Sequence, residues 1–174
     1  AEAAPADAVY SVDRMLVEVM ERGTGRPARK SLPPGLVVAG KTGTSNDYRD
    51  SWFSGFSGSH LIVVWMGHDD NSQTGLTGTT GALAAWSKLM SSIPTTSFDP
   101  LMPESLEDRW IDYYTGRETS PYCNGSAVKM PFRIGTSLYA SDDCPPGAGV
   151  ALDEEPAALT EGESVPAEEP PPVP

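Results

Sequence analysis

Six consecutive residues combine an amine, two hydroxyl groups and two glycines: Ala39-Gly40-Lys41-Thr42-Gly43-Thr44. They directly follow the apolar residues 36–38, with no turn-forming residue between the two segments. Because a short apolar and β-branched run is typical of a strand, we expect a strand over residues 36–44 whose exposed end carries the polar groups. Such an edge could pair with an extended peptide, bind its carboxylate, and offer a backbone N–H to an oxyanion.

The two faces of this strand are predicted to differ in chemistry. Side chains alternate along a strand, so Thr42 and Thr44 should share one face while Lys41 and Gly43 lie on the other. Gly43 has no side chain and would let the backbone of a ligand come close. A motif this short also has an ordinary alternative, namely a glycine-containing strand with a surface lysine.

A phosphate-binding loop is a more remote alternative, because residues 35–42 fit the pattern G-x-x-x-x-G-K-[ST]. A phosphate loop needs small, turn-forming residues between its glycines, and it opens a helix. Here the intervening residues are Leu, Val, Val and Ala, and no helical pattern follows. A metal site is also disfavoured, because His60 and His68, the latter next to Asp69 and Asp70, are more typical of turns or surface positions. We expect no cofactor in this portion of the protein.

The 174-residue chain has a formal net charge of −12, and its acidity is uneven. Residues 151–174 contain repeated prolines, no Lys or Arg, and the acids Asp153, Glu154, Glu155, Glu161, Glu163, Glu168 and Glu169. No basic stripe is left to neutralise phosphates, which argues against nucleic acid as a partner. The longest apolar run, residues 61–66, is far shorter than the roughly 20 residues of a membrane-spanning helix. Residues 1–8 carry no basic leader, so any export signal or anchor is expected upstream.

Before the strand, apolar residues at three- and four-residue steps predict an amphipathic helix over residues 8–22. Asp7 is expected to cap this helix and Gly23 to end it, with Glu18 one turn before Arg22. The basic residues that follow, between positions 26 and 30, are interpreted as a solvated loop.

After the strand, residues 52–56 and 61–66 flank a short glycine-containing turn and predict a β-hairpin. Because residues 61–66 are all apolar, we expect this strand to be covered on both faces, with helices packed on both sides of the sheet. One such helix is predicted over residues 81–90, with an apolar face. That face consists of Leu83, Trp86, Leu89 and Met90, and the core is expected to include Trp52, Trp65 and Trp86.

The sequence suggests three regions: residues 1–92, residues 93–149 and residues 150–174. The second is rich in Pro, Gly and Tyr and is predicted to be a small irregular or β-rich extension. Cys123 and Cys144 are consistent with one disulfide across it, in an oxidising compartment, although two buried thiols remain possible. The last region is too rich in Pro, Glu and Ala to bury apolar surface, and we expect it to be disordered.

Several segments in a fixed order resemble the transpeptidase domain of bifunctional class A penicillin-binding proteins, most closely of the 1B kind. They are Arg22-Gly23-Thr24-Gly25-Arg26, then Lys41-Thr42-Gly43-Thr44, then Trp52-Phe53-Ser54-Gly55, then Trp65-Met66-Gly67. The resemblance is strong over residues 8–90 and looser over 98–144. It implies the C-terminal portion of an α/β fold, an antiparallel sheet flanked by helices as in β-lactamases and transpeptidases.

The resemblance implies a D,D-transpeptidase that joins peptidoglycan stem peptides through a serine acyl-enzyme and is the target of β-lactams. Lys41 would lie beside the substrate carboxylate and share in proton transfer. The hydroxyls of Thr42 and Thr44 would hold that carboxylate, the Thr44 N–H would complete the oxyanion hole, and Gly43 would keep the strand accessible. Expected partners are stem peptides, β-lactams, the N-terminal part of the same domain and cell-wall regulatory proteins.

The sequence departs from that family in one important respect, because the nucleophile is missing. The family's Ser-x-x-Lys and Ser-x-Asn precede the Lys-Thr-Gly strand. Ser126-Ala127-Val128-Lys129 spells the first pattern but follows Lys41 and lies within the cysteine-containing extension, so we interpret it as a chance match. The chain is therefore expected to be a C-terminal fragment, inactive alone, on the periplasmic face of a bacterial inner membrane. A glycosyltransferase domain and the anchor would lie upstream, and a non-catalytic cell-wall or partner-binding module is the alternative.

Overall fold

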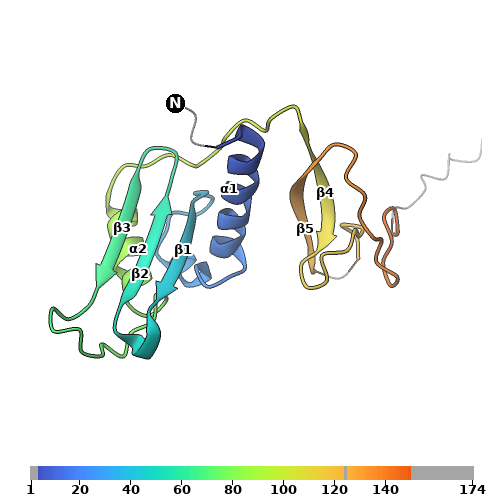
Figure 1. The fold of residues 1–174 in the computed structure, drawn as a ribbon. Coiled ribbons are helices and arrows are strands. Elements are labelled where there is room, and N and C mark those ends of the chain that lie inside the picture. Colours follow the sequence, from blue (N-terminus) through green and yellow to red (C-terminus); the bar gives the residue numbers. More distant parts are fainter. Residues whose placement is uncertain (1–3, 124, 150–174) are drawn as a thin grey trace, which may run out of the picture.

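The computed structural model describes residues 4–123 and 125–149 (Figure 1). These residues form two α-helices, two short 3-10 helices and two antiparallel sheets. In chain order the elements are α1 (Ala6–Glu21), η1 (Arg26–Lys30), β1 (Ala39–Thr44), η2 (Asn46–Tyr48), β2 (Ser51–Phe56), β3 (Leu61–Met66), α2 (Ala82–Ser92), β4 (Leu106–Asp112) and β5 (Ala127–Arg133). The predicted fold class, an antiparallel sheet flanked by helices, is confirmed.

The first sheet has the strand order β1-β2-β3, and both of its pairings are antiparallel. The predicted hairpin is confirmed, since β2 pairs with β3 along its whole length, from Ser51 opposite Met66 to Phe56 opposite Leu61. The order leaves β1, with its lysine and hydroxyls, at one edge of the sheet (Figure 1).

The predicted strand over residues 36–44 is too long, because β1 begins only at Ala39. Val37 instead pairs with the segment that follows α2. Its N–H donates to the Ser97 hydroxyl at 3.1 Å, and its carbonyl accepts from the Phe98 N–H at 2.9 Å. The apolar side chains of this stretch are still used for packing, since Val38 is fully buried.

The main core lies between one face of the sheet and α2. Phe53 of β2 and Trp86 of α2 are fully buried, with ring centroids 4.9 Å apart. The Trp86 indole also donates to the Gly55 carbonyl at 3.3 Å, which satisfies its buried N–H. Met20 of α1 belongs to the same core cluster, so both α-helices share one core with the sheet.

The helix expected over residues 81–90 is confirmed as α2, Ala82–Ser92. Three of its four predicted core residues are buried: Leu83, Trp86 and Met90. The fourth assignment was wrong, because Leu89 is 46% exposed. An apolar stripe predicted from spacing alone was therefore wider than the surface that the sheet offers to the helix.

The opposite face of the sheet is open, and we call its exposed apolar residues, Trp52, Leu61, Val63 and Trp65, the open face. Leu61 is 70% exposed and Val63 57%, so the prediction that β3 is covered on both faces was wrong. Trp52 and Trp65 are each 45% exposed, so of the three tryptophans expected in the core only Trp86 lies there. Trp52 and Trp65 pack on each other across the strands, with centroids 6.1 Å apart.

The amphipathic helix expected over residues 8–22 is present as α1, Ala6–Glu21. Asp7 does not cap it, because Pro5 occupies the N-cap position and Asp7 lies within the first turn. The predicted contact between Glu18 and Arg22 forms at 3.0 Å. The basic segment after α1 is not simply a solvated loop, because residues 26–30 form η1 and Ala28 is buried.

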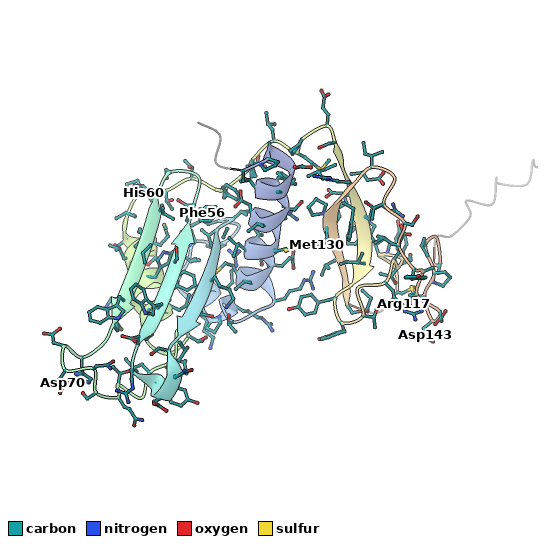
Figure 2. All side chains as sticks on the ribbon, viewed as in Figure 1. Phe56, His60, Asp70, Arg117, Met130 and Asp143 are labelled. Atoms are coloured by element: carbon teal, nitrogen blue, oxygen red, sulfur yellow. A yellow bond between two sulfur atoms is a disulfide. The ribbon has the colours of Figure 1, made fainter. Side chains whose placement is uncertain are left out.

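Strands β4 and β5 form a separate two-stranded antiparallel sheet, and the expected disulfide joins Cys123 to Cys144 with 6.1 Å between their Cα atoms. This β4–β5 hairpin lies against α1 (Figure 2), where Arg133 pairs with Asp7 at 2.7 Å. Residues 150–174, predicted to be disordered, lie outside the described residues. Within the described ranges, no helix is long and apolar enough to cross a bilayer.

Candidate active site

Lys41, Thr42 and Thr44 come together at the exposed edge formed by β1. The Lys41 ammonium donates to the Thr42 carbonyl at 2.9 Å and lies 3.4 Å from the Thr42 hydroxyl. Thr42 stands opposite Phe53, and Lys41 stands opposite Ser54, so the two residues start on different faces of the strand. The long lysine side chain bends over the edge and brings its charge to the hydroxyl.

Thr44 is held in place by the loop that leads into α2. Its hydroxyl accepts a hydrogen bond from the Gly78 N–H at 2.9 Å. Gly78 can approach this closely only because it has no side chain: an added Cβ would lie 2.7–2.9 Å from backbone atoms of Gly43 and Trp52. A hydroxyl that accepts a hydrogen bond keeps its own proton for donation. The exposed Thr44 can therefore donate to an incoming anion.

Ser51 of β2 holds the same loop against the sheet. The sequence alone did not identify this residue as part of the site. Its fully buried hydroxyl accepts from the Ala82 N–H and donates to the Thr77 carbonyl, both at 2.8 Å. Ser51 also stands opposite Thr44 in the sheet. The available signal was the run of glycines and threonines over residues 77–81, directly before an apolar helix.

The loop that follows α1 is fixed to the same edge by two threonines. The Thr24 and Thr42 hydroxyls lie 2.8 Å apart, and the Thr79 hydroxyl donates to the Thr24 carbonyl at 3.2 Å. Gly25 allows the loop to turn against α1, since an added Cβ would lie 2.4 Å from the Met20 sulfur. The loop after α1 and the loop before α2, which are far apart in sequence, thus meet at β1.

The chemistry available at this edge is anion binding. Lys41 and Thr44 are exposed, and they supply one positive charge and one hydroxyl proton to the same edge. An ionised donor facing a carboxylate makes hydrogen bonds roughly twice as strong as neutral ones. The arrangement therefore suits a carboxylate-bearing ligand that lies along β1.

The Ser126–Lys129 pattern does not form a comparable site. Ser126 directly precedes β5 and its hydroxyl donates to Asp112, while Lys129, within β5, pairs with Asp108 at 3.8 Å. Ser126 lies in a turn and Lys129 in a strand, and their side chains bind the carboxylates of two different residues, Asp112 and Asp108. The Ser126 hydroxyl and the N–H and hydroxyl of Thr115 lower the pKa of Asp112 below its ordinary value. The contacts thus act as a turn-stabilising network.

The phosphate-loop alternative is contradicted by the backbone. The residues Gly40-Lys41-Thr42 lie inside strand β1, and a three-residue 3-10 helix, η2, follows the strand instead of an α-helix. Within residues 4–123 and 125–149, no group of three or more His, Cys, Asp or Glu side chains is placed to hold a metal ion.

A three-stranded antiparallel sheet with a Lys-Thr-Gly-Thr edge strand and flanking helices matches part of the fold of a penicillin-binding transpeptidase domain. The penicillin-binding protein 1A of Haemophilus influenzae, solved by crystallography, matches 80% of this chain and 22% of its own, with a TM-score of 0.64 and 24% identity. No family model matches the sequence.

Sequence relatives identify the family to which this fold belongs. Penicillin-binding protein 1B of Escherichia coli is 37% identical over 129 residues, which is 74% of this chain and 15% of that protein. Penicillin-binding protein 1A of Pseudomonas aeruginosa is 32% identical over 168 residues, 94% of this chain and 19% of that protein. Over most of its length, this chain is therefore homologous to class A penicillin-binding proteins, and it spans less than a fifth of the length of these relatives.

Proposed function

We propose that this chain supplies the Lys-Thr-Gly-Thr strand of a serine-type D,D-transpeptidase that cross-links peptidoglycan stem peptides and reacts with β-lactams. The observation that carries the proposal is the edge strand β1, on which Lys41 and Thr44 expose a charge and a hydroxyl proton. The homology to penicillin-binding proteins supports it.

In this proposal the residues of β1 have separate roles. Lys41 lies beside the substrate carboxylate and takes part in proton transfer. The hydroxyls of Thr42 and Thr44 bind the carboxylate, and the Thr44 N–H contributes to the oxyanion hole, where a preorganised donor acts most strongly in the transition state. Gly43 leaves room for the peptide backbone.

We propose that the serine nucleophile comes from residues outside this chain. The same residues would supply the surface that covers the open face. Trp52, Leu61, Val63 and Trp65 expose a contiguous apolar surface that a complete domain would bury. We therefore propose that the remainder of the transpeptidase domain packs on this face and completes the active site. A glycosyltransferase activity and a periplasmic, membrane-anchored location are proposed for the full-length protein on the homology alone.

A chimera tests the proposal directly. The segment of Escherichia coli penicillin-binding protein 1B that aligns with this chain is replaced by the chain, and the product is incubated with a fluorescent penicillin. We expect covalent labelling of the chimera and none of the isolated chain. Lys41→Ala should lower the labelling rate by about 10²–10³, the usual cost of losing one stabilising group at such a site.

Two variants serve as matched controls. Lys88→Ala removes an exposed lysine from α2, and Ser126→Ala removes the serine of the chance match; both should label like the parent chimera. Labelling of the isolated chain at Ser126 would overturn the assignment of the nucleophile. A folded chimera that does not label would refute the transpeptidase proposal and favour a non-catalytic binding module.

A further inference from the structure

Three hollows that share lining residues lie beside α1 and around its C-terminal end, and we call them together the α1 groove. Their volumes are about 250, 290 and 790 Å³. Tyr113 lines both the first and the second hollow, while Arg22 and Arg26 line both the second and the third. The β4–β5 hairpin forms the other wall of the first two hollows, which follows from its position beside α1 (Figure 1).

The groove changes in chemistry along its length. Its first hollow is mainly apolar, and Met130 of β5 faces α1 (Figure 2). The hollow is lined by Met15, Val19, Ile111, Val128 and Met130, together with Glu18 and Tyr113. The middle hollow shares Tyr113 with the first and adds Tyr114. The last hollow is basic and is lined by Arg22, Arg26, Arg29 and Lys30 together with Glu21.

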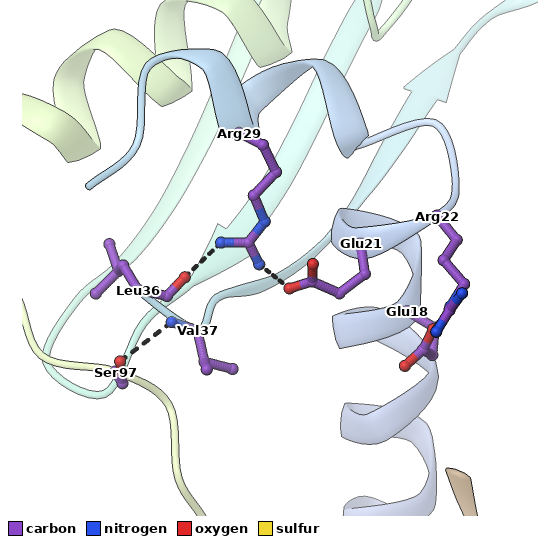
Figure 3. Close-up of polar contacts among 7 residues, drawn as sticks. All are labelled: Glu18, Glu21, Arg22, Arg29, Leu36, Val37 and Ser97. Carbon is purple, nitrogen blue, oxygen red and sulfur yellow. Dashed lines mark hydrogen bonds and ion pairs between the residues drawn. The ribbon is translucent and has the colours of Figure 1, made fainter. Parts of the chain in front are cut away.

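Half of the basic side chains in the last hollow are already paired. Arg22 binds Glu18, and Arg29 binds Glu21 and the Leu36 carbonyl (Figure 3). Arg26 and Lys30 are exposed and have no carboxylate partner among the residues that the structure describes. The groove thus ends in two uncompensated positive charges on a chain whose net charge is −12.

We propose that the α1 groove binds the chain's own C-terminal segment, residues 150–174, with its acids over Arg26 and Lys30. The composition of that segment is complementary to the groove. It contains seven acids and no bases, interspersed with Leu, Val and Pro. Opposite charges at this density attract when the two partners lie within about one Debye length, roughly 8–10 Å. The match is both electrostatic and apolar.

The point at which the described chain ends makes this contact reachable. A Cβ at Gly149 would lie 2.8 Å from Cβ of Tyr122, so the chain leaves the hairpin beside Tyr122. Gly125, close in sequence, lines the middle hollow with Arg22 and Arg26. Glu161 is twelve residues beyond Gly149, and an extended chain of that length spans about 40 Å. The acidic segment can therefore reach the basic hollow without rearrangement of the hairpin.

The proposed contact gains strength because both partners belong to one chain. Exposed ion pairs are individually weak, but covalent linkage through a short connection gives the acids an effective concentration of about 1 mM at the basic hollow. The docking itself does not depend on the proposed function. One consequence does: because Thr24 joins this end of the groove to Thr42, a docked acidic segment would compete with substrate carboxylates near β1.

Carbodiimide cross-linking of the full chain, read by mass spectrometry, tests the proposal, because the reagent joins a carboxylate to a lysine amine in contact with it. Lys30 is the lysine in the groove. Lys129 is the matched control: it follows Val128 and precedes Met130, both of which line the groove, so it points away from α1. Lys129 also lies on the hairpin from which the segment emerges.

We expect residues 150–174 to link to Lys30 at least about fivefold more than to Lys129 at low salt, and the preference to be lost near 0.5 M salt. Arg26→Glu should reduce the Lys30 links, whereas Arg14→Glu, an equal charge change on α1 rather than on η1, should not. Equal links to both lysines would overturn the proposal. Links mainly between two chains, seen as a covalent dimer, would also overturn it and indicate docking between copies.

Discussion

Ser51 is the residue whose replacement most directly tests how the candidate site is built. Its buried hydroxyl binds two backbone groups at the start of α2: it accepts from the Ala82 N–H and donates to the Thr77 carbonyl. Ser51→Ala removes both hydrogen bonds. The Thr77 carbonyl still accepts from the Gly81 N–H, whereas the N–H of the buried Ala82 is left unsatisfied. An unsatisfied buried polar group costs about 1–3 kcal/mol, and this is the expected loss of unfolding free energy.

That loss is a measurable fraction of the whole stability of a typical domain, about 5–15 kcal/mol. Urea unfolding of the chain, followed by tryptophan fluorescence, measures it. Ser54→Ala is a matched control, because Ser54 lies on the same strand, is exposed, and makes no side-chain hydrogen bond within the described chain. It should change stability by less than about 0.5 kcal/mol.

The same substitution should also affect the site, since Ser51 fixes the loop that contacts Thr44. In the penicillin-labelling chimera, Ser51→Ala is expected to slow labelling, while the exposed α2 variant Lys88→Ala leaves it unchanged. If Ser51→Ala and Ser54→Ala lose similar amounts of stability in the isolated chain, or if Ser51→Ala loses less than about 0.5 kcal/mol, the buried hydroxyl does not hold the loop. The account of how Thr44 is positioned would then be wrong.

Three further predictions concern the rest of the chain. Gly40→Ala should destabilise it by about 1–3 kcal/mol, because the new methyl would lie 2.6 Å from a buried phenyl ring, whereas Gly125→Ala meets open space and should be neutral. Reduction of the Cys123–Cys144 disulfide should cost about 3 kcal/mol, and a thiol count under denaturing, non-reducing conditions should give none; two thiols would contradict the pairing. Hydrogen bonds lower the folded-state pKa of Asp112, so its contribution to stability is complete above its ordinary pKa of 3.8 and is lost as the pH falls through the lower folded value. Thermal unfolding of Asp112→Asn should therefore show a weaker acid dependence than the parent, and an unchanged dependence would contradict this.

Much of the local structure could be predicted because its causes are local. The hairpin of β2 and β3 follows from two apolar runs around a short turn, and α2 follows from the spacing of Leu83, Trp86 and Met90. The Lys-Thr-Gly-Thr stretch was expected on an exposed strand, and β1 places it there. Each of these predictions depends on residues within a few positions of one another.

The errors of prediction share a different cause. Whether Leu61, Trp52 or Leu89 is buried depends on which element covers it. The residue type alone does not indicate whether such an element is present. Asp7 has the right type for a cap, but the helix begins at Ala6, two residues earlier than predicted, and the Asp7 carboxylate pairs with Arg133, 126 positions away. Competing partners distant in sequence decided each of these cases.

The sequence by itself therefore determined the chemistry of β1: an ammonium, two hydroxyls and a glycine on alternating faces of one strand. Only the tertiary structure decided what surrounds that strand. It brought Thr24, Ser51 and Gly78 to the edge that carries Lys41, and it placed the β4–β5 hairpin against α1 to form the groove. The physical reason is that side-chain chemistry and backbone period are properties of neighbouring residues, whereas burial and hydrogen-bond partnership are settled between segments that meet only when the chain is folded.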